Sequence, residues 1–252
     1  MNPVKIGYPL IHLPSVDSTN VYAITLLQTT SVTEGTVILA DHQMKGKGQG
    51  GSLWQSDSNT NLLFSVILKP DFLRADKQYY LSMCISAGIA DFVGSVAGNA
   101  LIKWPNDILA GEKKIAGILI ENSIMGENLY TSVVGIGLNV NQVNFPDDIP
   151  DPVSLRMITG ETYELPALFN RLLESLTRAI ELLYTGRLDI IKNTYLNKLW
   201  RLNQWHWFSD AGGKFEGRIT DVAESGELIV MRKNNELKYY GFKEIQLSTP
   251  QI

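Results

Sequence analysis

The glycine-rich segment 46–51, which reads GKGQGG, is the part of the chain best suited to bind an anion. Closely spaced glycines let backbone N–H groups turn toward a phosphate or carboxylate, and Lys45 and Lys47 add positive charge. The segment fits the G-x-G-x-x-G pattern, but the strand before it ends early and SLWQSDSNTN is a poor helix start. Kinase and Walker-type loops are excluded because their companion residues are missing from the sequence. We expect an anion-binding loop of another class, with a mobile surface hairpin as the alternative.

Three later segments carry polar residues within or beside apolar runs. KWPND must end a strand because proline lacks a backbone donor, so Asn106 and Asp107 face a cleft or form a simple β-turn. Lys114 opens an apolar strand, where an ammonium neutralises a carboxylate or phosphate unless it is only a solvated edge lysine. In GIGLNVN the glycines admit a flat ligand and Asn139 offers a donor and an acceptor; a β-bulge is the alternative.

Predicted strands and helices must position these residues. Apolar runs and helical spacing predict strands over 36–40, 62–68, 100–104, 114–121 and 130–140, and helices after Asp17-Ser18-Thr19, over 78–96 and over 166–199 with a break near Gly186. This order predicts an α+β fold with a mixed, mainly antiparallel sheet flanked by helices. Beyond Trp207, short strands between turn residues predict a small β-barrel or a stack of hairpins. We expect a large domain over 1–205 and a small one over 206–252.

The amino-acid composition limits which classes of protein this chain can belong to. The 252 residues are 44% apolar and 19% charged, which is ordinary for a soluble globular chain, and the net charge of −4 argues against a nucleic-acid partner. The single cysteine, Cys84, excludes an intrachain disulfide, and His12, His42 and His206 show no metal-ligand spacing. Neither a secretory signal nor an uninterrupted membrane-length apolar run is visible, so we expect a cytoplasmic protein without a membrane partner.

Together and in this order, these segments resemble the biotin–protein ligase (holocarboxylase synthetase) family. The matching segments are Ser18-Thr19-Asn20, Gln43 with the loop through Trp54, KWPND at 103–107, KKIAGILIE at 113–121 and GIGLNVN at 135–141. The resemblance covers about residues 8 to 145, and beyond them it extends to the architecture only. It implies a class II synthetase-like catalytic domain followed by an SH3-like barrel. It also implies a monofunctional type without the DNA-binding helix-turn-helix of some members, because Ser18 lies so near the start.

The resemblance implies an ATP-dependent ligase that converts biotin to biotinyl-AMP. Biotin then passes to a lysine of the biotin carboxyl carrier protein of acetyl-CoA carboxylase or a related carboxylase, by a step in which Cys84 has no role. Lys114, Lys47 and Asp107 match catalytic positions, because cations must hold a carboxylate against a phosphate. Magnesium is expected with ATP, held largely by phosphate oxygens near Asp107 and not by a protein-only site. We expect a monomer or a homodimer.

Binding positions follow from the same match, residue by residue. The biotin side comprises Ser18, Thr19, Asn20, Gln43, Gly46, Lys47, Gly48, Gln49, Trp54, Lys114 and Gly117. The ATP and adenylate side comprises Lys45, Lys47, Gln49, Lys103, Asn106, Lys114 and Asn139. The family's loop commonly reads G-R-G-R, whereas this chain has Lys47 and Gln49. We therefore expect a looser hold on the adenylate, unless Lys45 compensates.

Two other functions are open at this point. A lipoate- or octanoyl–protein ligase has the same architecture, although KWPND and the GKGQGG loop favour biotin. A biotin-sensing protein without catalysis would keep its ligand affinity after loss of Lys114, whereas a ligase would lose adenylation. Nucleic-acid binding by the small barrel is disfavoured by its mixed charges. The ligase hypothesis requires Lys114 and the segment 46–51 to share one hollow.

Overall fold

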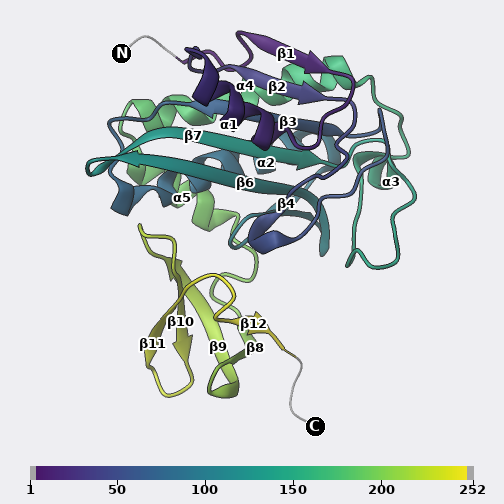
Figure 1. Ribbon diagram of the computed structural model, residues 1–252. Helices are drawn as coiled ribbons and strands as arrows, with labels where there is room; N and C mark the ends of the chain where they lie inside the picture. The colour runs from purple at the N-terminus through teal and green to yellow at the C-terminus, as the bar shows by residue number, and fades with distance from the viewer. Residues whose placement is uncertain (1–3, 249–252) are drawn as a thin grey trace.

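The computed structural model describes residues 4–248, and its larger part is built on one seven-stranded sheet (Figure 1). The strands are β1 Leu10–Leu13, β2 Val37–Ala40, β3 Leu62–Leu68, β4 Ala100–Lys103, β5 Asp107–Ala110, β6 Lys113–Met125 and β7 Asn128–Leu138. Their order is β1-β2-β3-β7-β6-β5-β4, with β1 parallel to β2 and the other neighbours antiparallel. The predicted mixed, mainly antiparallel sheet is confirmed.

Helices cover both faces of this sheet. They are α1 Thr19–Thr29, α2 Tyr79–Ala97, α3 Leu155–Thr159, α4 Leu165–Tyr184 and α5 Leu188–Asn197. Phe64 and Val66 of β3 join the large core with α2 and α4, whereas Ile67 packs in a smaller cluster with Ala23 of α1. Because both faces are covered, all seven residues of β3 are buried, which explains its unbroken run LLFSVIL.

Helix α2 is a core helix that lies against the sheet and α4. By length and composition the segment Ala75–Ala97 could cross a membrane, but 67% of its apolar window is buried inside the fold. Cys84 lies in this helix, and its thiol donates to the carbonyl of Ala179 at 2.8 Å. Burial raises the pKa of the Cys84 thiol, so the group stays protonated. A nucleophilic role for this cysteine has no support.

The C-terminal part forms a second sheet below the first (Figure 1). Its strands are β8 Trp205–Asp210, β9 Gly213–Val222, β10 Leu228–Arg232, β11 Leu237–Tyr240 and β12 Gln246–Leu247, in the order β11-β10-β9-β8-β12. Within residues 4–248 the edge strands β11 and β12 do not pair with each other, and β12 has only two residues. The small β-domain is therefore present, but the predicted closed SH3-like barrel is corrected to an open sheet.

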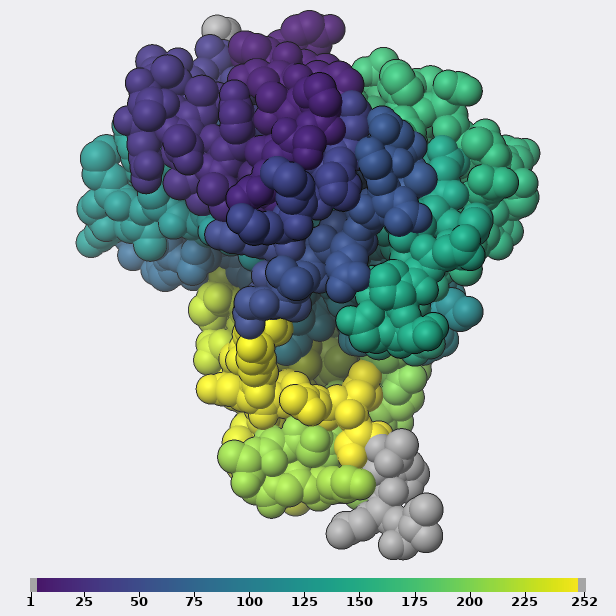
Figure 2. Space-filling model, turned by 45° about the vertical axis from the view of Figure 1, so that its right-hand side comes forward, coloured from purple at the N-terminus to yellow at the C-terminus, as the bar shows by residue number. Residues whose placement is uncertain are grey.

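The small sheet packs directly on the larger part (Figure 2). Its apolar residues, such as Phe208 and Leu228, belong to the same core cluster as α2 and the seven-stranded sheet. The Trp104 indole N–H donates to the carbonyl of Gly226 at 2.9 Å, and Tyr80 donates to Glu224 at 2.9 Å. A shared core and direct polar contacts hold the two sheets together, as expected for a unit too small to bury its own core.

Most predicted elements match the structure, and two strands were missed. The predicted strand 62–68 coincides with β3, and the predicted helix 78–96 corresponds to α2 within one residue at each end. β1 is a four-residue edge strand containing His12, so its pattern carried little signal. β5 begins at Asp107, so KWPND makes the turn between β4 and β5. The prediction that a strand ends at this proline is therefore correct, and so is the alternative that the segment forms a turn.

Candidate active site

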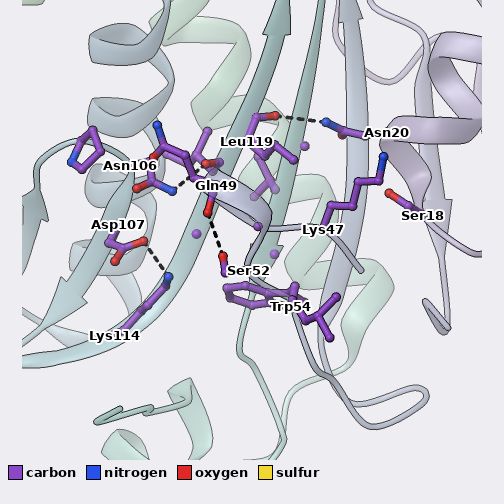
Figure 3. A pocket seen from close by; sticks show the side chains of 18 of the residues that line it. Ser18, Asn20, Lys47, Gln49, Ser52, Trp54, Asn106, Asp107, Lys114 and Leu119 are labelled. Atoms are coloured by element: carbon purple, nitrogen blue, oxygen red, sulfur yellow. Dashed lines mark hydrogen bonds and ion pairs between the residues drawn. The ribbon is translucent and has the colours of Figure 1, made fainter. Parts of the chain in front are cut away.

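A pocket opens above the middle of the sheet, between the start of α1, the glycine-rich loop and the β4–β5 turn (Figure 3). The predicted residues that line it are Ser18, Thr19, Asn20, Gln43, Lys47, Gly48, Gln49, Trp54, Lys103, Asn106, Asp107, Lys114 and Gly117. Segments far apart in the sequence therefore meet around one hollow. Lys114 and the loop share that hollow, as the ligase hypothesis requires.

Three predicted residues lie outside this pocket. Lys45 is 75% exposed and its Nζ pairs with Asp17 at 2.9 Å, so the structure does not place it as a compensating cation. Gly46, the first residue of the loop, packs against the Trp54 backbone, and an added Cβ would stand 2.4 Å from the Trp54 carbonyl. Asn139 lines an adjoining pocket whose wall includes Lys103 and the Lys114–Asp107 pair.

One end of the pocket is polar and formed by residues at the start of α1. Gln43 Oε1 accepts hydrogen bonds from the Thr19 backbone N–H at 2.7 Å and from the Thr19 hydroxyl at 3.0 Å. Asn20 Nδ2 donates to the carbonyl of Leu119 at 3.2 Å and to Glu121 at 2.7 Å. Ser18 is the N-cap residue of α1, but its side chain makes no cap hydrogen bond. Its hydroxyl is left to face the pocket.

The opposite end is charged. Lys114 Nζ lies 2.6 Å from Asp107 Oδ1, and the two side chains are 33% and 21% exposed. Lys103 also lines the pocket, so this end holds two lysines and one carboxylate. Asn106 holds the turn to β6, because its Nδ2 donates to the carbonyl of Ile118 and its own carbonyl accepts from the Ile118 N–H, both at 3.0 Å. The excess of positive charge suits an anionic ligand.

Between the two ends, the Trp54 indole lies on bare backbone (Figure 3). Gly117 and Gly137 are partners on β6 and β7, and a Cβ on them would stand 2.8 Å and 2.4 Å from the indole. The sequence predicted that glycines here would admit a flat ligand, and the flat group found over them is Trp54 itself. Lys114 Nζ lies 5.7 Å from the centre of this ring. Trp54 therefore separates the polar end from the charged end.

The glycine-rich loop is a short hairpin that also lines the pocket. The Gly48 N–H donates to the carbonyl of Ser52 at 2.8 Å, and the Trp54 N–H donates to the carbonyl of Gly46 at 2.9 Å. Gly50 has φ +66°, and its missing Cβ makes room for Phe242 and Lys243. The amides of Gly48 and Trp54 are thus used inside the hairpin. Of the amides in segment 46–51, that of Gly48 is therefore not free to bind an anion. Convergence of the other loop amides on an anion stays a prediction, and Lys47 supplies positive charge from the same loop.

Some pocket residues gave no usable signal in the sequence. Phe242 reaches the pocket from the C-terminal sheet, and no local pattern relates it to the loop. Ser65 lies behind the polar end and contacts Thr19 and Asn20. It is the one polar residue of β3, LLFSVIL, and this break in an apolar strand was the available signal. Within residues 4–248 no group of three or more His, Cys, Asp and Glu residues is placed to hold a metal ion.

Comparison with known proteins agrees with this architecture. The model of the biotin/lipoate A/B protein ligase family matches residues 12–139, so the chain belongs to that family. A bifunctional ligase/repressor BirA from Bacillus subtilis is 28% identical over 239 residues, covering 93% of this chain and 73% of that protein. A biotin–[acetyl-CoA-carboxylase] ligase from Paracoccus denitrificans is 29% identical over 227 residues, covering 86% and 92% of the two chains.

A solved structure supports the same assignment for the whole chain. The biotin protein ligase from Aquifex aeolicus, in complex with biotin and ATP, superposes with a TM-score of 0.79 at 27% identity. The match covers 95% of this chain and 99% of the other, so it includes both sheets.

Proposed function

We propose that this chain is an ATP-dependent biotin–protein ligase. The observation that carries the proposal is the two-ended pocket, in which uncharged polar groups lie at one end and Lys103, Asp107 and Lys114 lie at the other. Biotin has the matching layout: a ureido ring with N–H and C=O groups, an apolar ring and chain, and a terminal carboxylate. The relatives named as biotin ligases, and the neighbour solved with biotin and ATP, support the same ligands here.

The polar end favours biotin over lipoate. Lipoate carries a disulfide ring without N–H or C=O groups, so it would leave the Ser18 hydroxyl and Gln43 Nε2 without hydrogen-bond partners. An unsatisfied buried polar group costs about 1–3 kcal/mol. A ureido ring supplies both a donor and an acceptor to the same groups. We place the ureido ring at this end and the biotin chain along Trp54 and Gly117.

The charged end supports the activation step. We propose that a carboxylate oxygen of biotin attacks the α-phosphorus of ATP, forming a C–O–P anhydride while pyrophosphate leaves. Both reactants are anions, and the ammonium group of Lys114 offsets their repulsion. Lys47, whose ammonium points toward Ser18 and Asn20 (Figure 3), adds positive charge to the pocket as a whole. Asp107 holds Lys114 in place through their 2.6 Å ion pair. Magnesium would accompany ATP, held largely by phosphate oxygens, and Asp107 is the carboxylate lining the pocket that would assist in holding it.

We place the nucleotide on the same side, toward the adjoining pocket. Lys103 and Asn106 border the phosphate end, and Asn139 lines the neighbouring hollow. In the transfer step, the amine of a carrier lysine attacks the acyl carbon of biotinyl-AMP, an amide forms, and AMP leaves with the bonding electrons. No enzyme nucleophile is needed. The carrier is a carboxylase carrier protein, as the names of the relatives suggest.

We further propose that residues 1–205 form the catalytic unit and residues 206–252 a smaller unit that completes its pocket. β8 begins at Trp205, and Phe242 of the smaller unit lines the pocket. We also propose cytoplasmic residence, where ATP and carboxylases are available. The oligomeric state proposed is a monomer or homodimer that does not bind nucleic acid.

A direct assay tests the proposed function. The purified chain is incubated with ATP, magnesium, biotin and a biotin carrier domain, and the mass of that domain is measured. We expect a mass increase of one biotinyl group that requires ATP and the carrier lysine. Parallel reactions with lipoate and octanoate serve as the comparison. Modification by lipoate but not by biotin, or no modification at all, would overturn the proposal.

A further inference from the structure

A buried serine connects the polar end of the pocket to the middle of the sheet. Ser65 lies on β3 with no exposed surface, on the face that α1 covers. Its Oγ lies 2.6 Å from Asn20 Oδ1 and 2.7 Å from the Thr19 hydroxyl. Thr19 and Asn20 line the pocket, whereas Ser65 does not. Ser65 therefore contacts the residues of the pocket from behind.

The contacts of Asn20 determine which way its amide faces. Asn20 Nδ2 points to the carbonyl of Leu119 and to the Glu121 carboxylate, and both are pure acceptors. Its Oδ1 must then face Ser65, and because a carbonyl oxygen only accepts, Ser65 is the donor. The Thr19 hydroxyl has one proton, which it donates to Gln43 Oε1 at 3.0 Å. In its 2.7 Å contact with Ser65 the Thr19 hydroxyl is therefore the acceptor, and the Ser65 proton is shared between Asn20 Oδ1 and Thr19 Oγ1.

The same network determines the orientation of Gln43. Its Oε1 accepts from the Thr19 backbone N–H at 2.7 Å, so its Nε2 is the donor that remains. Among the described residues, no hydrogen bond engages Gln43 Nε2 or the Ser18 hydroxyl. The network thus separates the polar groups into those used internally, Thr19 and Asn20, and those left for a ligand.

We propose that Ser65 is a positioning residue for recognition of the ligand's polar head. It never touches the ligand. Its hydroxyl holds Asn20 and Thr19, and Thr19 in turn holds Gln43, so that a fixed set of donors and acceptors faces the pocket. Such pre-organisation lowers the ordering that binding would otherwise require. This inference rests on the proposed function and deepens it, because it names the residue that fixes the orientation of the side chains expected to bind the biotin ureido ring.

Another buried serine provides a matched control. Ser132 lies on β7, next to β3, and is likewise fully buried, but its Oγ has no hydrogen-bond partner within residues 4–248. Ser65→Ala and Ser132→Ala therefore delete the same atom from neighbouring strands of the same sheet. Only the first deletion removes a donor that the pocket residues use.

The experiment measures biotin-dependent ATP–pyrophosphate exchange by the full chain. Ser65→Ala should raise the KM for biotin about tenfold, with kcat and the KM for ATP within about twofold of wild type. Ser132→Ala should leave all three parameters within about twofold. A purely structural role for Ser65 would instead reduce the amount of active enzyme, which lowers the apparent kcat and leaves the KM for biotin unchanged.

Ser65→Cys keeps the test decisive should the alanine variant fold poorly. The thiol has nearly the size of the hydroxyl and is a weaker donor, so its KM for biotin should lie between wild type and the alanine variant. Equal biotin KM values for the Ser65 variants and Ser132→Ala would overturn the inference while leaving the proposed function intact. A wild-type chain without exchange activity would overturn both.

Discussion

At the scale of single residues, the pocket depends on a few charged and polar side chains with distinct tasks. Lys114 is held by Asp107 beside Trp54, at the charged end of the pocket. Gln49, in the loop, has a buried Oε1 with no partner among the described residues. Lys114 supplies a positive charge to the pocket. Gln49 is uncharged at a loop position where the family commonly has arginine.

Replacement of Lys114 by alanine should abolish most of the activation step. The variant loses the ammonium that offsets repulsion between carboxylate and phosphate, so kcat/KM for adenylation should fall by about 100-fold or more. The assay is ATP–pyrophosphate exchange with biotin. Lys113→Ala is the control, because this neighbouring lysine is exposed. Exchange that survives the loss of Lys114 would favour a biotin-binding protein without catalysis.

Replacement of Gln49 by arginine should slow the release of biotinyl-AMP. Arginine adds a planar, charged donor group to the loop that covers the anion, and such groups bind phosphate strongly. Release is measured as the rate at which labelled adenylate leaves the isolated complex. Lys45→Ala should not alter that rate, because Lys45 is paired with Asp17 outside the pocket. An unchanged rate for Gln49→Arg would show that the loop's charge does not control retention.

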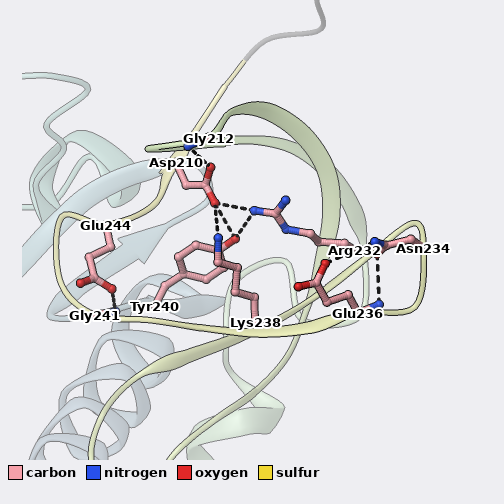
Figure 4. Close-up of polar contacts among 9 residues, drawn as sticks. All are labelled: Asp210, Gly212, Arg232, Asn234, Glu236, Lys238, Tyr240, Gly241 and Glu244. Atoms are coloured by element: carbon pink, nitrogen blue, oxygen red, sulfur yellow. Dashed lines mark hydrogen bonds and ion pairs between the residues drawn. The ribbon is translucent and has the colours of Figure 1, made fainter.

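At the scale of elements, the open C-terminal sheet is fastened by one buried carboxylate (Figure 4). Asp210 on β8 is only 4% exposed, and its Oδ2 accepts from Lys238 at 3.1 Å and Tyr240 at 3.0 Å on β11 and pairs with Arg232 on β10. β8 does not neighbour β10 or β11 in the sheet. This cluster thus joins strands that backbone hydrogen bonds leave apart.

Asp210→Asn should destabilise the protein by about 2 kcal/mol, because it leaves partly buried cations without their counter-charge. Burial raises the pKa of Asp210, but hydrogen bonds from Lys238, Gly212 and Tyr240 and the charge of Arg232 outweigh it, so the pKa lies below the ordinary 3.8. The carboxylate therefore stabilises the fold above pH 3.8, and this contribution disappears as pH falls through the lower folded value.

Chemical denaturation between pH 3 and pH 7 measures this effect. The wild type should lose more stability than Asp210→Asn over the acidic part of the range, so that the two curves converge at low pH. Asp147→Asn removes an exposed acid and should follow the wild type. Parallel curves for wild type and Asp210→Asn would contradict a stabilising role for the carboxylate.

At the scale of the whole molecule, the C-terminal sheet contacts the glycine-rich loop (Figure 2). Lys243 Nζ donates to the carbonyl of Gly50 at 3.1 Å, and Phe242 lines the pocket. Lys243 has φ +69°, a conformation that favours glycine, and its turn is closed by the Gly241 N–H bonded to Glu244 at 2.7 Å. A turn from one part of the chain therefore steadies a loop from the other.

Lys243→Ala should free the loop. We expect trypsin to cleave after Lys45 and Lys47 several-fold faster in the variant than in the wild type, because cleavage needs local opening. Lys214→Ala is the control, since this lysine is exposed on the same sheet. Equal cleavage rates for Lys243→Ala and the wild type would mean that the contact does not restrain the loop.

The sequence by itself determined the fold class and much of the pocket. Apolar periodicity located β3 and α2, because burial of a strand on two faces or of a helix in a core leaves a regular pattern. Motif resemblance brought Lys114, Trp54 and the start of α1 to one site, and the structure places them there. Short edge strands such as β1 were missed, since four residues carry too little pattern.

Only the tertiary structure decided which side chains face the pocket and which contact other parts of the protein. Three outcomes depend on contacts between distant segments. Lys45 pairs with Asp17 and does not face the pocket, the flat group over Gly137 is Trp54, and Ser65 is a hydrogen-bond donor to Asn20. Side-chain directions and hydrogen-bond partners across elements are fixed by packing. Local sequence does not encode them, because each depends on which other segment the fold brings within about 3 Å.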